Sequence, residues 1–366
     1  MFVADVLVVG GGVIGMLSAL ELQARGAMVV VYDAAPRRPP ASWAGGGILS
    51  PLFPWRYSAG ANALCVDVNE NYQCWAQRII EAGGVDPEIT VSGLFAVCAD
   101  KERQVAEWAK KFGYEYATKE SSQGAGYWLP DIGSIRNGRL MKGLATLMAA
   151  RGIPLLHAEV DQFYAGNDGV TVHIGSDRVT CDQLLVAAGW WSSSLLSRSL
   201  AADVCLKHVM QDVFPAKGEM LLYRAPQGLL KHIILTDEGY LIPRRDGHIL
   251  VGSTHQEGIS DMRPSVLAAD TLVALGQRLL PALKEYLPVA QWTGVRPGHR
   301  RDVPLIDYFS GSERVWLSSG HYRNGLVAAP GSARLVAQRI SGEATDLDPS
   351  FYSFSSPGSS DSFCKR

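Results

Sequence analysis

The feature that most constrains this chain is a glycine-rich turn that directly follows a short valine-rich run. Residues 3–9 (VADVLVV) predict a buried parallel strand, and the turn after it is Gly10-Gly11-Gly12-Val13-Ile14-Gly15. A helical pattern of leucines comes next, and residues 27–32 (AMVVVY) predict a second buried strand that ends at Asp33. This order of strand, glycine turn, helix, strand and acid predicts a βαβ unit that binds a dinucleotide.

The glycines of this turn have separate tasks in dinucleotide binding. Gly10 permits the tight turn, Gly12 lets the backbone approach a pyrophosphate, and Gly15 lets the helix pack against the strand. The N–H groups at the start of the helix would face the phosphates. Asp33 lies where a carboxylate accepts hydrogen bonds from a ribose, which argues against a 2′-phosphate. The unit by itself leaves NAD and FAD open.

A second glycine cluster lies at residues 42–50 (SWAGGGILS). Its three consecutive glycines let the backbone approach a flat ligand closely, and the apolar residues 51–55 (PLFPW) argue against a flexible surface loop. Later, a short predicted strand at residues 315–317 leads into 318–325 (SSGHYRNG) and an apolar helix from about Leu326. A helix start approached by glycines would suit the electron-rich edge of a reduced flavin.

Together with residues 184–191 (LLVAAGWW), these segments resemble the D-amino-acid oxidase and sarcosine oxidase family of flavoproteins, and within it the glycine oxidases. The motifs that carry the resemblance extend over nearly the whole chain: SWAGGGILSPLFPWRY (42–57), YLIPRRDGHILVGST (240–254), GVRPG (294–298) and GHYRNGLVAAP (320–330). Several different motifs in the right order are far more specific than any one of them.

The resemblance implies an α/β fold, α+β overall. A Rossmann-like FAD-binding domain would be joined to a substrate domain built on a large antiparallel β-sheet. The FAD-binding domain is expected at residues 1–80, 136–205 and 300–350, and the substrate domain at 81–135 and 206–299. The Ser-rich residues 351–366 are expected to form a flexible tail.

The resemblance also implies FAD as the cofactor. We expect it to be non-covalent, since no cysteine lies within the matched flavin motifs. The residues expected to contact FAD come from five parts of the chain: Gly10, Gly12, Val13, Ile14, Gly15 and Asp33; Ser42, Trp43, Ala44, Gly45, Gly46 and Gly47; Val160; Ala188, Gly189 and Trp190; and Arg296, His321, Tyr322, Arg323, Asn324, Gly325 and Leu326.

Arg296, in the segment WTGVRPG, is our candidate for binding a substrate carboxylate, because a guanidinium can grip a carboxylate through two parallel hydrogen bonds. Its local sequence also reads as a surface arginine in a Pro-Gly loop, and the resemblance favours the carboxylate. By the same resemblance the hydroxyl of Tyr240 contacts the carboxylate, although sheet tyrosines are common. Arg323 would approach the substrate or the flavin edge and assist O₂ reduction, the alternative being a helix-cap or salt-bridge arginine.

The resemblance implies oxidation of the C–N bond of a small amino acid, most simply glycine, by hydride transfer to flavin N5. O₂ would reoxidise the flavin, giving glyoxylate, ammonia and hydrogen peroxide, and the glycine imine would supply thiamine thiazole synthesis. Sarcosine and small D-amino acids stay open, because Glu238 and His255 depart from some glycine oxidases near the expected pocket. Asp307 is a third departure, in place of a glycine. A dehydrogenase of related amino acids and a non-catalytic flavoprotein are the alternatives.

Composition argues against several other classes of protein. A formal net charge of −2 gives no long-range attraction to nucleic acid or to an acidic membrane surface, and no apolar run reaches the ~18 residues of a membrane span. We expect no metal site, because no His/Cys set has metal-binding spacing. Six cysteines without a CxxC pair and a start that lacks the basic region of a signal peptide favour a cytoplasmic protein. Similar glycine oxidases are tetramers, so we expect a homo-oligomer.

Overall fold

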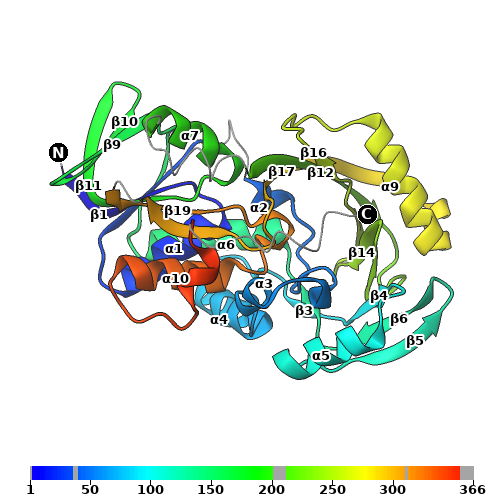
Figure 1. The fold of residues 1–366 in the computed structure, drawn as a ribbon. Coiled ribbons are helices and arrows are strands. Elements are labelled where there is room, and N and C mark those ends of the chain that lie inside the picture. The colour runs from blue at the N-terminus through cyan, green and yellow to red at the C-terminus, as the bar shows by residue number, and fades with distance from the viewer. Residues whose placement is uncertain (1, 36–39, 201–211, 310–311, 355–366) are drawn as a thin grey trace.

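The computed structural model describes residues 2–35, 40–200, 212–309 and 312–354. Figure 1 shows two lobes, each built on one large β-sheet, with the chain crossing between them several times. The first lobe carries the N-terminal βαβ unit and most of the long helices. Within the described residues, the pairings of the sheet in the second lobe are antiparallel with a single exception, the parallel pair β13–β4. The predicted fold class is confirmed.

Parallel strands form the centre of the first sheet, in the order β19-β11-β1-β2-β8. Their bounds are β1 (Phe2–Val9), β2 (Val29–Asp33), β8 (Leu155–His157), β11 (Asp177–Val186) and β19 (Ser312–Ser319). Antiparallel neighbours extend the sheet: β18 (Leu305–Phe309) pairs with β19, and β10 (Gly169–Ile174) pairs with β11 and with β9 (Gln162–Gly166). β2 is buried along its whole length, as its valine run predicts for a central parallel strand.

The first sheet is covered on both faces. One face packs against α1 (Val13–Ala24), α4 (Val68–Glu81), α6 (Asn137–Ala150) and α10 (Ala329–Ile340), and the other against α7 (Ser192–Ser199) and the β9–β10 hairpin. Because the parallel strands have apolar side chains on both faces, each face needs such a cover. α10 begins three residues after the predicted start at Leu326, because the 3₁₀ helix η4 (Tyr322–Asn324) comes first.

The second sheet has the order β16-β12-β15-β14-β13-β4-β6-β5, with β17 also paired to β12. Its strands are β4 (Leu94–Val97), β5 (Ala117–Ser121), β6 (Gly124–Leu129), β12 (Val213–Arg224), β13 (Ile233–Thr236), β14 (Gly239–Pro243), β15 (His248–Gly252), β16 (Gln256–Glu257) and β17 (Pro288–His299). The predicted hairpin around residues 244–247 is confirmed, since β14 and β15 pair across it. Gly247 has the positive φ of +84° that this turn requires.

The two faces of the second sheet have different roles. One face packs against α9 (Val266–Leu279) and the 3₁₀ helix η3 (Pro281–Glu285). The other face, which includes Tyr240, packs against Ile48 and Phe53 from the segment that follows the second glycine cluster, and against α5 (Glu102–Phe112). That second face therefore meets the loop expected to hold a flavin.

Short elements join the lobes. They are α2 (Ala41–Ala44), η1 (Pro54–Arg56), α3 (Ala59–Ala63), the small sheet of β3 (Thr90–Val91) and β7 (Gly133–Ser134), and η2 (Gly189–Trp191). α2 lies against β17 and α6, where the indole N–H of Trp292 donates to the Ala44 carbonyl at 3.0 Å. These contacts join the second glycine cluster to both lobes.

The predicted start of the tail, at residue 351, is wrong. Residues Pro349–Tyr352 form the 3₁₀ helix η5, and the fully buried Tyr352 donates its hydroxyl proton to the Gly60 carbonyl at 2.8 Å. Packing of this ring in the hydrophobic core of the first lobe fixes the segment, which a Ser-rich composition does not reveal. The remainder of the predicted tail, residues 355–366, lies outside the described residues.

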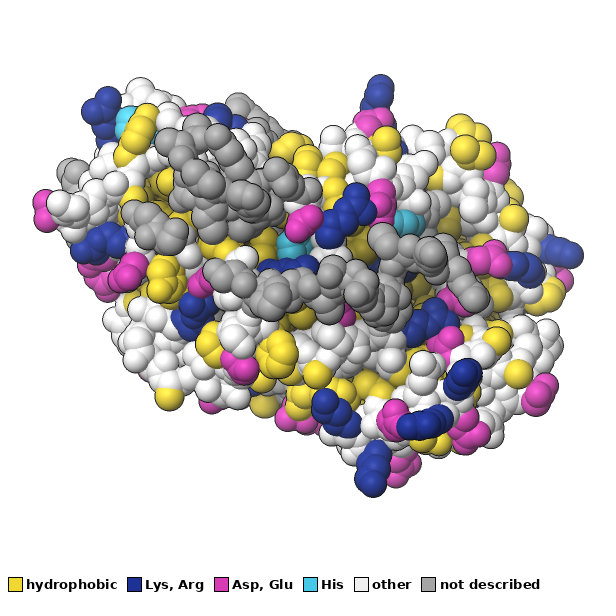
Figure 2. Space-filling view, viewed as in Figure 1, with side chains coloured by type: hydrophobic (Ala, Val, Ile, Leu, Met, Phe, Trp, Pro, Cys, Tyr) yellow, Lys and Arg dark blue, Asp and Glu magenta, His cyan; other side chains and the backbone are white. Residues whose placement is uncertain are grey.

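The surface has no single dominant sign of charge on the face seen in Figure 2, where basic and acidic side chains are interspersed. No helix within the described ranges has both the length and the apolar character needed to cross a membrane. The same part of the chain contains no group of three or more His, Cys, Asp or Glu side chains placed to hold a metal ion.

Candidate active site

The parallel strands of the first sheet end together, and their ends form one rim of a large cavity. Gly10 follows β1, Asp33 ends β2, Ala188 follows β11 and Ser319 ends β19, and all four line this cavity. Ligands of open α/β sheets bind at the carboxyl ends of the strands. The cavity contains about 1710 Å³ of empty space, part of it open to solvent, and continues from this rim to the second sheet.

The glycine turn has the geometry that its sequence predicts. Gly10 has a φ of +114°, and a Cβ there would come within 2.5 Å of the Ala187 carbonyl oxygen. A Cβ on Gly15 would lie 1.9 Å from the Gly10 oxygen, so Gly15 allows α1 to approach the strand and does not itself line the cavity. Gly12, by contrast, faces the cavity. The turn therefore presents its backbone and the start of α1 to a ligand.

Two side chains complete the start of α1. Asp33 is nearly buried and accepts hydrogen bonds from the Gly11 and Ala35 amides, the latter at 2.6 Å. The Ser42 hydroxyl accepts from the Val13 amide at 3.0 Å. Val13 and Ile14 also line the cavity, as predicted. A carboxylate fixed beside a helix N-terminus is the arrangement that binds ribose next to a pyrophosphate.

The second glycine cluster is held in place by side chains that sequence reasoning missed. A guanidinium N–H of Arg244 donates to the Gly46 carbonyl at 2.7 Å, and another donates to the Ile135 carbonyl at 3.1 Å. Burial, followed by the charge of Arg136, lowers the pKa of Arg244 to about 10. The Asn137 amide donates to the Ser42 carbonyl at 2.7 Å.

Asn137 leaves one buried polar atom for a ligand. Its side-chain oxygen is buried, and among the described residues it has no hydrogen-bond partner. Asn137 lines the cavity beside Gly45 and Gly47. Gly47 has a φ of +82°, and a Cβ there would lie 2.0 Å from the Ile135 oxygen. The unpaired oxygen and the bare backbone beside it fit a flat ligand with polar edges, as a flavin is.

The opposite wall of the cavity comes from the ends of β11 and β19. Gly189 has a φ of +58°, and apart from its chain neighbours no described residue has an atom within 4 Å of the position that its Cβ would occupy. Its carbonyl accepts from the Ser319 hydroxyl at 3.0 Å, and Trp190 lines the cavity beside it. His321 is buried, its Nε2 lies 3.0 Å from the Ser332 hydroxyl oxygen, and burial lowers its pKa to about 3. A neutral imidazole therefore stands at this wall near pH 7.

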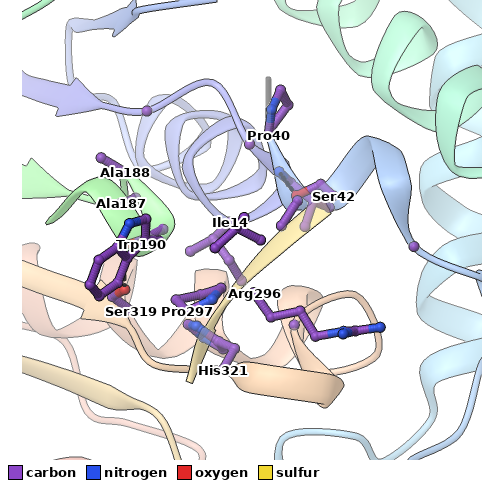
Figure 3. Close-up of a pocket in the computed structure, with 18 of the residues that line it drawn as sticks. Ile14, Pro40, Ser42, Ala187, Ala188, Trp190, Arg296, Pro297, Ser319 and His321 are labelled. Atoms are coloured by element: carbon purple, nitrogen blue, oxygen red, sulfur yellow. Dashed lines mark hydrogen bonds between the residues drawn. The ribbon is translucent and has the colours of Figure 1, made fainter. Parts of the chain in front are cut away.

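Arg296 lies on β17 and reaches into the same cavity. Figure 3 shows its side chain extending away from Trp190 and Ala188. Its Nη2 donates to the Ser253 hydroxyl at 2.7 Å, whereas its Nη1 is buried and has no partner among the described residues. Burial lowers the pKa of Arg296; Arg323 acts in the same direction and Tyr240 opposes the shift. An unpaired buried guanidinium N–H is a site for an anion.

Tyr240 meets the glycine cluster at this end of the cavity. Its side chain is 6% exposed, and its ring and hydroxyl would lie 2.8 Å from a Cβ on Gly46. The described neighbours of the hydroxyl include only a weak acceptor, the Met220 sulfur at 3.7 Å. Tyr240 therefore keeps a strong donor for a ligand that lies next to Arg296.

The remaining candidates line the cavity with four exceptions. Those lining it are Gly45, Val160, Tyr322, Arg323, Gly325 and Leu326, together with the residues described above. The residues that do not line it are Gly15, Trp43, Ala44 and Asn324. Trp43 is half-exposed and packs edge-on against Trp292 with 5.9 Å between ring centroids. Residues that sequence reasoning missed line it too, including Tyr32, Pro40, Ile48, Leu52, Asn137, Arg198, Ser253 and Met262.

The three departures from the family pattern have different outcomes. Glu238 points away from the cavity and forms an exposed two-pronged ion pair with Arg278, at 2.6 and 2.9 Å. His255 does not line the cavity, but its Nε2 lies 2.8 Å from the hydroxyl of Tyr322, which does. Asp307 accepts from Arg339 at 2.7 Å and from the Phe354 amide at 3.1 Å, so it holds the C-terminal segment.

Comparison with known proteins agrees with this geometry. The chain matches the FAD dependent oxidoreductase family over residues 5–339. It is 37% identical to a glycine oxidase of Pseudomonas aeruginosa, with 95% of this chain and 97% of the relative covered. A bifunctional protein ThiO/ThiG of Synechocystis is 27% identical over 92% of this chain and 51% of its own length.

The fold is also shared with a solved structure, the glycine oxidase of Geobacillus kaustophilus. The TM-score is 0.87 at 24% sequence identity, with 96% of this chain and 98% of that chain covered. The resemblance inferred from the sequence motifs is thereby confirmed. This chain belongs to the FAD-dependent oxidoreductase family.

Proposed function

We propose that this protein oxidises glycine with FAD as its cofactor, and that sarcosine and small D-amino acids are secondary substrates. The observation that carries the proposal is the buried Nη1 of Arg296, which has no hydrogen-bond partner among the described residues and lies where the second sheet lines the cavity. The curated relatives of matching length named glycine oxidase support the choice of substrate.

The residues present fit FAD along the whole cavity. Asp33 would hold the ribose, the start of α1 the pyrophosphate, and the glycine cluster with Asn137 the ring system. When bound, FAD would supply the hydride acceptor of the reaction. We predict non-covalent binding, because no cysteine is found among the described residues that line the cavity. Flavin that stays in an acid-precipitated pellet would contradict this prediction.

The protein contributes mainly the orientation of the substrate. Arg296 and the Tyr240 hydroxyl would bind the carboxylate, which fixes the direction of the Cα–H bond. Ile48 and Leu52 pack with Tyr240 in one apolar cluster, so the space around Cα suits a small side chain. Arg323 places a second positive charge at the cavity wall, where it would stabilise the anion formed during O₂ reduction.

Proton transfer from the substrate amine needs no strong protein base in this arrangement. The acidic side chains among the described lining residues are Asp33, which ends β2, and Glu159, which follows β8, both at the dinucleotide end. His321, with a pKa of about 3, is too weak a base near pH 7. We therefore propose that the amine enters the reaction neutral, with its proton lost to solvent before hydride transfer.

We propose further properties that rest on weaker support. The two sheets support a cofactor-binding part and a substrate-binding part with the boundaries predicted from the sequence. The four described cysteines are unpaired, which supports a reducing compartment such as the cytoplasm. A homo-oligomer, O₂ as electron acceptor and supply of the glycine imine to thiazole synthesis follow from the resemblance to glycine oxidases.

The decisive experiment is anaerobic mixing of the purified holoprotein with glycine, followed by admission of air. Bleaching of the flavin absorbance and its recovery with peroxide release are expected. Bleaching only with sarcosine or D-alanine would change the assigned substrate from glycine to that amino acid. Bleaching without recovery in air would indicate a dehydrogenase. No bleaching with any of these amino acids would refute the proposed function.

A further inference from the structure

The two terminal nitrogens of Arg296 are not equivalent. Nη2 is bound to the Ser253 hydroxyl at 2.7 Å, and Nη1 is buried without a partner among the described residues. Each terminal nitrogen carries two N–H groups, so the bond to Ser253 uses one N–H of Nη2 and leaves the other. Both N–H groups of Nη1 are therefore left for a substrate, and the orientation of Nη2 is fixed by its bond to Ser253.

The guanidinium is also confined from behind. A Cβ on Gly218 would lie 2.2 Å from Nη1 and 2.5 Å from Nη2, so the bare backbone of β12 packs directly against its plane. The ring of Tyr240 closes the cavity nearby. With the backbone of β12 on one side and Ser253 on Nη2, the guanidinium has one orientation open to it.

Ser253 is itself firmly placed. Its neighbour Thr254 bonds twice to the backbone of Glu219, with its hydroxyl oxygen accepting at 2.9 Å and its amide donating at 3.2 Å. The Glu219 side chain is fully buried and accepts from the Ser265 amide at 2.8 Å and from Gln291 at 2.9 Å. These hydrogen bonds fix the start of the loop after β15, and Ser253 is the first residue of that loop.

The hydroxyl of Ser253 has a proton left to donate. It accepts from Arg296, which uses a lone pair, and no other hydrogen bond of this hydroxyl is made to the described residues. Ser253 lines the cavity beside Arg296 and Tyr240. Both residues line the same cavity and are joined by a hydrogen bond, so we expect a carboxylate bound to Arg296 to accept from the Ser253 hydroxyl as well.

We infer that Ser253 is a positioning and specificity residue for the substrate carboxylate. Its hydroxyl oxygen holds Nη2 of Arg296 so that Nη1 faces the cavity, and its hydroxyl proton is donated to the second carboxylate oxygen. This inference rests on the proposed function for the identity of the substrate. The recognition of a carboxylate by this pair of residues can be tested without turnover.

The test compares Ser253→Thr with Ser253→Val, which have side chains of nearly the same shape and differ in the hydroxyl. Acetate, and its neutral counterpart acetamide, are titrated into each holoprotein and followed by calorimetry and by the flavin spectrum. We expect the valine variant to bind acetate roughly tenfold more weakly than the threonine variant, the effect of one hydrogen bond to a charged group. Binding of acetamide is expected to change less than threefold.

Steady-state kinetics with glycine supply the second readout. We expect KM to rise about tenfold in Ser253→Val and kcat to change less than threefold, while Ser253→Thr restores the wild-type KM. Ser260→Ala, at an exposed serine between β16 and α9, is the control. Equal acetate affinities in the threonine and valine variants would overturn the inference, and so would an equal loss for acetate and acetamide, because that result means a general distortion of the pocket.

The outcomes for this inference and for the proposed function are separable. The wild-type holoprotein could fail to oxidise glycine while removal of the Ser253 hydroxyl weakens acetate binding. That result would support the carboxylate site and refute the substrate assignment. If glycine is oxidised but the acetate affinity is the same with and without the hydroxyl, the proposed function is supported and the role of Ser253 is refuted.

Discussion

Substitution of Arg296 by alanine separates the role of this residue in catalysis from any role in stability. The side chain is buried, one terminal nitrogen has no partner among the described residues, and burial lowers the pKa of the guanidinium. Such a cation is not expected to stabilise the folded protein, because its desolvation is only partly compensated. We therefore expect Arg296→Ala to fold, to retain FAD, and to be at least as resistant to urea as the wild type.

The expected loss of activity follows from the contacts that the structure leaves free. One N–H of Nη2 already donates to Ser253, so we count in full only the charged hydrogen bond from Nη1, which has no partner among the described residues. A hydrogen bond to a charged group contributes about 1.5–3 kcal/mol, and loss of the positive charge places the effect at the upper end. A loss of about 3 kcal/mol corresponds to roughly 10²-fold in kcat/KM.

The assay is peroxide release with glycine, with FAD content and urea midpoints measured on the same preparations. The matched control is Arg103→Ala, which removes an exposed arginine whose ion pair, with Glu107 at 2.7 Å, lies within α5. Its kcat/KM and FAD content should equal those of the wild type. The reasoning is refuted if Arg296→Ala keeps kcat/KM within threefold of the wild type, or if its activity falls only in proportion to lost FAD or lost stability.

Three further predictions follow from the same structure. Burial lowers the pKa of His321 to about 3 and of His299 to about 4, below the ~6.5 of an unfolded histidine. The unfolded state therefore binds more protons, so the free energy of unfolding should fall on the order of 1–2 kcal/mol per histidine as the pH is lowered from 7 to 5. His321→Gln should flatten this pH dependence in urea titrations. Gly47→Ala should destabilise the protein by at least about 2 kcal/mol more than Gly26→Ala, because both have positive φ but only Gly47 has a carbonyl oxygen 2.0 Å from the new Cβ; equal urea midpoints would contradict this. Asp33→Asn should weaken FAD binding about tenfold or more in flavin-release titrations, since the carboxylate accepts the Gly11 amide beside the predicted ribose; unchanged affinity would place the ribose elsewhere.

Local pattern was sufficient for the elements that a short stretch of chain determines. The strand, glycine turn and helix at residues 3–24 form as predicted because their apolar periodicity and the steric demands of Gly10 and Gly15 are properties of neighbouring residues. The hairpin around residues 244–247 is similarly local. The family resemblance then brought Arg296 and Tyr240, which are 56 positions apart in the chain, into one predicted site.

The contacts that hold the site together were decided only in the tertiary structure. Arg244 bonds the glycine cluster 198 residues earlier in the chain, and Ser253 bonds Arg296 across 43 residues. The fully buried Tyr352 donates its hydroxyl proton to the carbonyl of Gly60, 292 residues earlier in the chain, although the composition of its segment predicted a flexible tail. Hydrogen bonds and packing of this kind depend on which strands become neighbours in the sheets. No local residue pattern specifies such neighbours, and they exist only once the tertiary structure has formed.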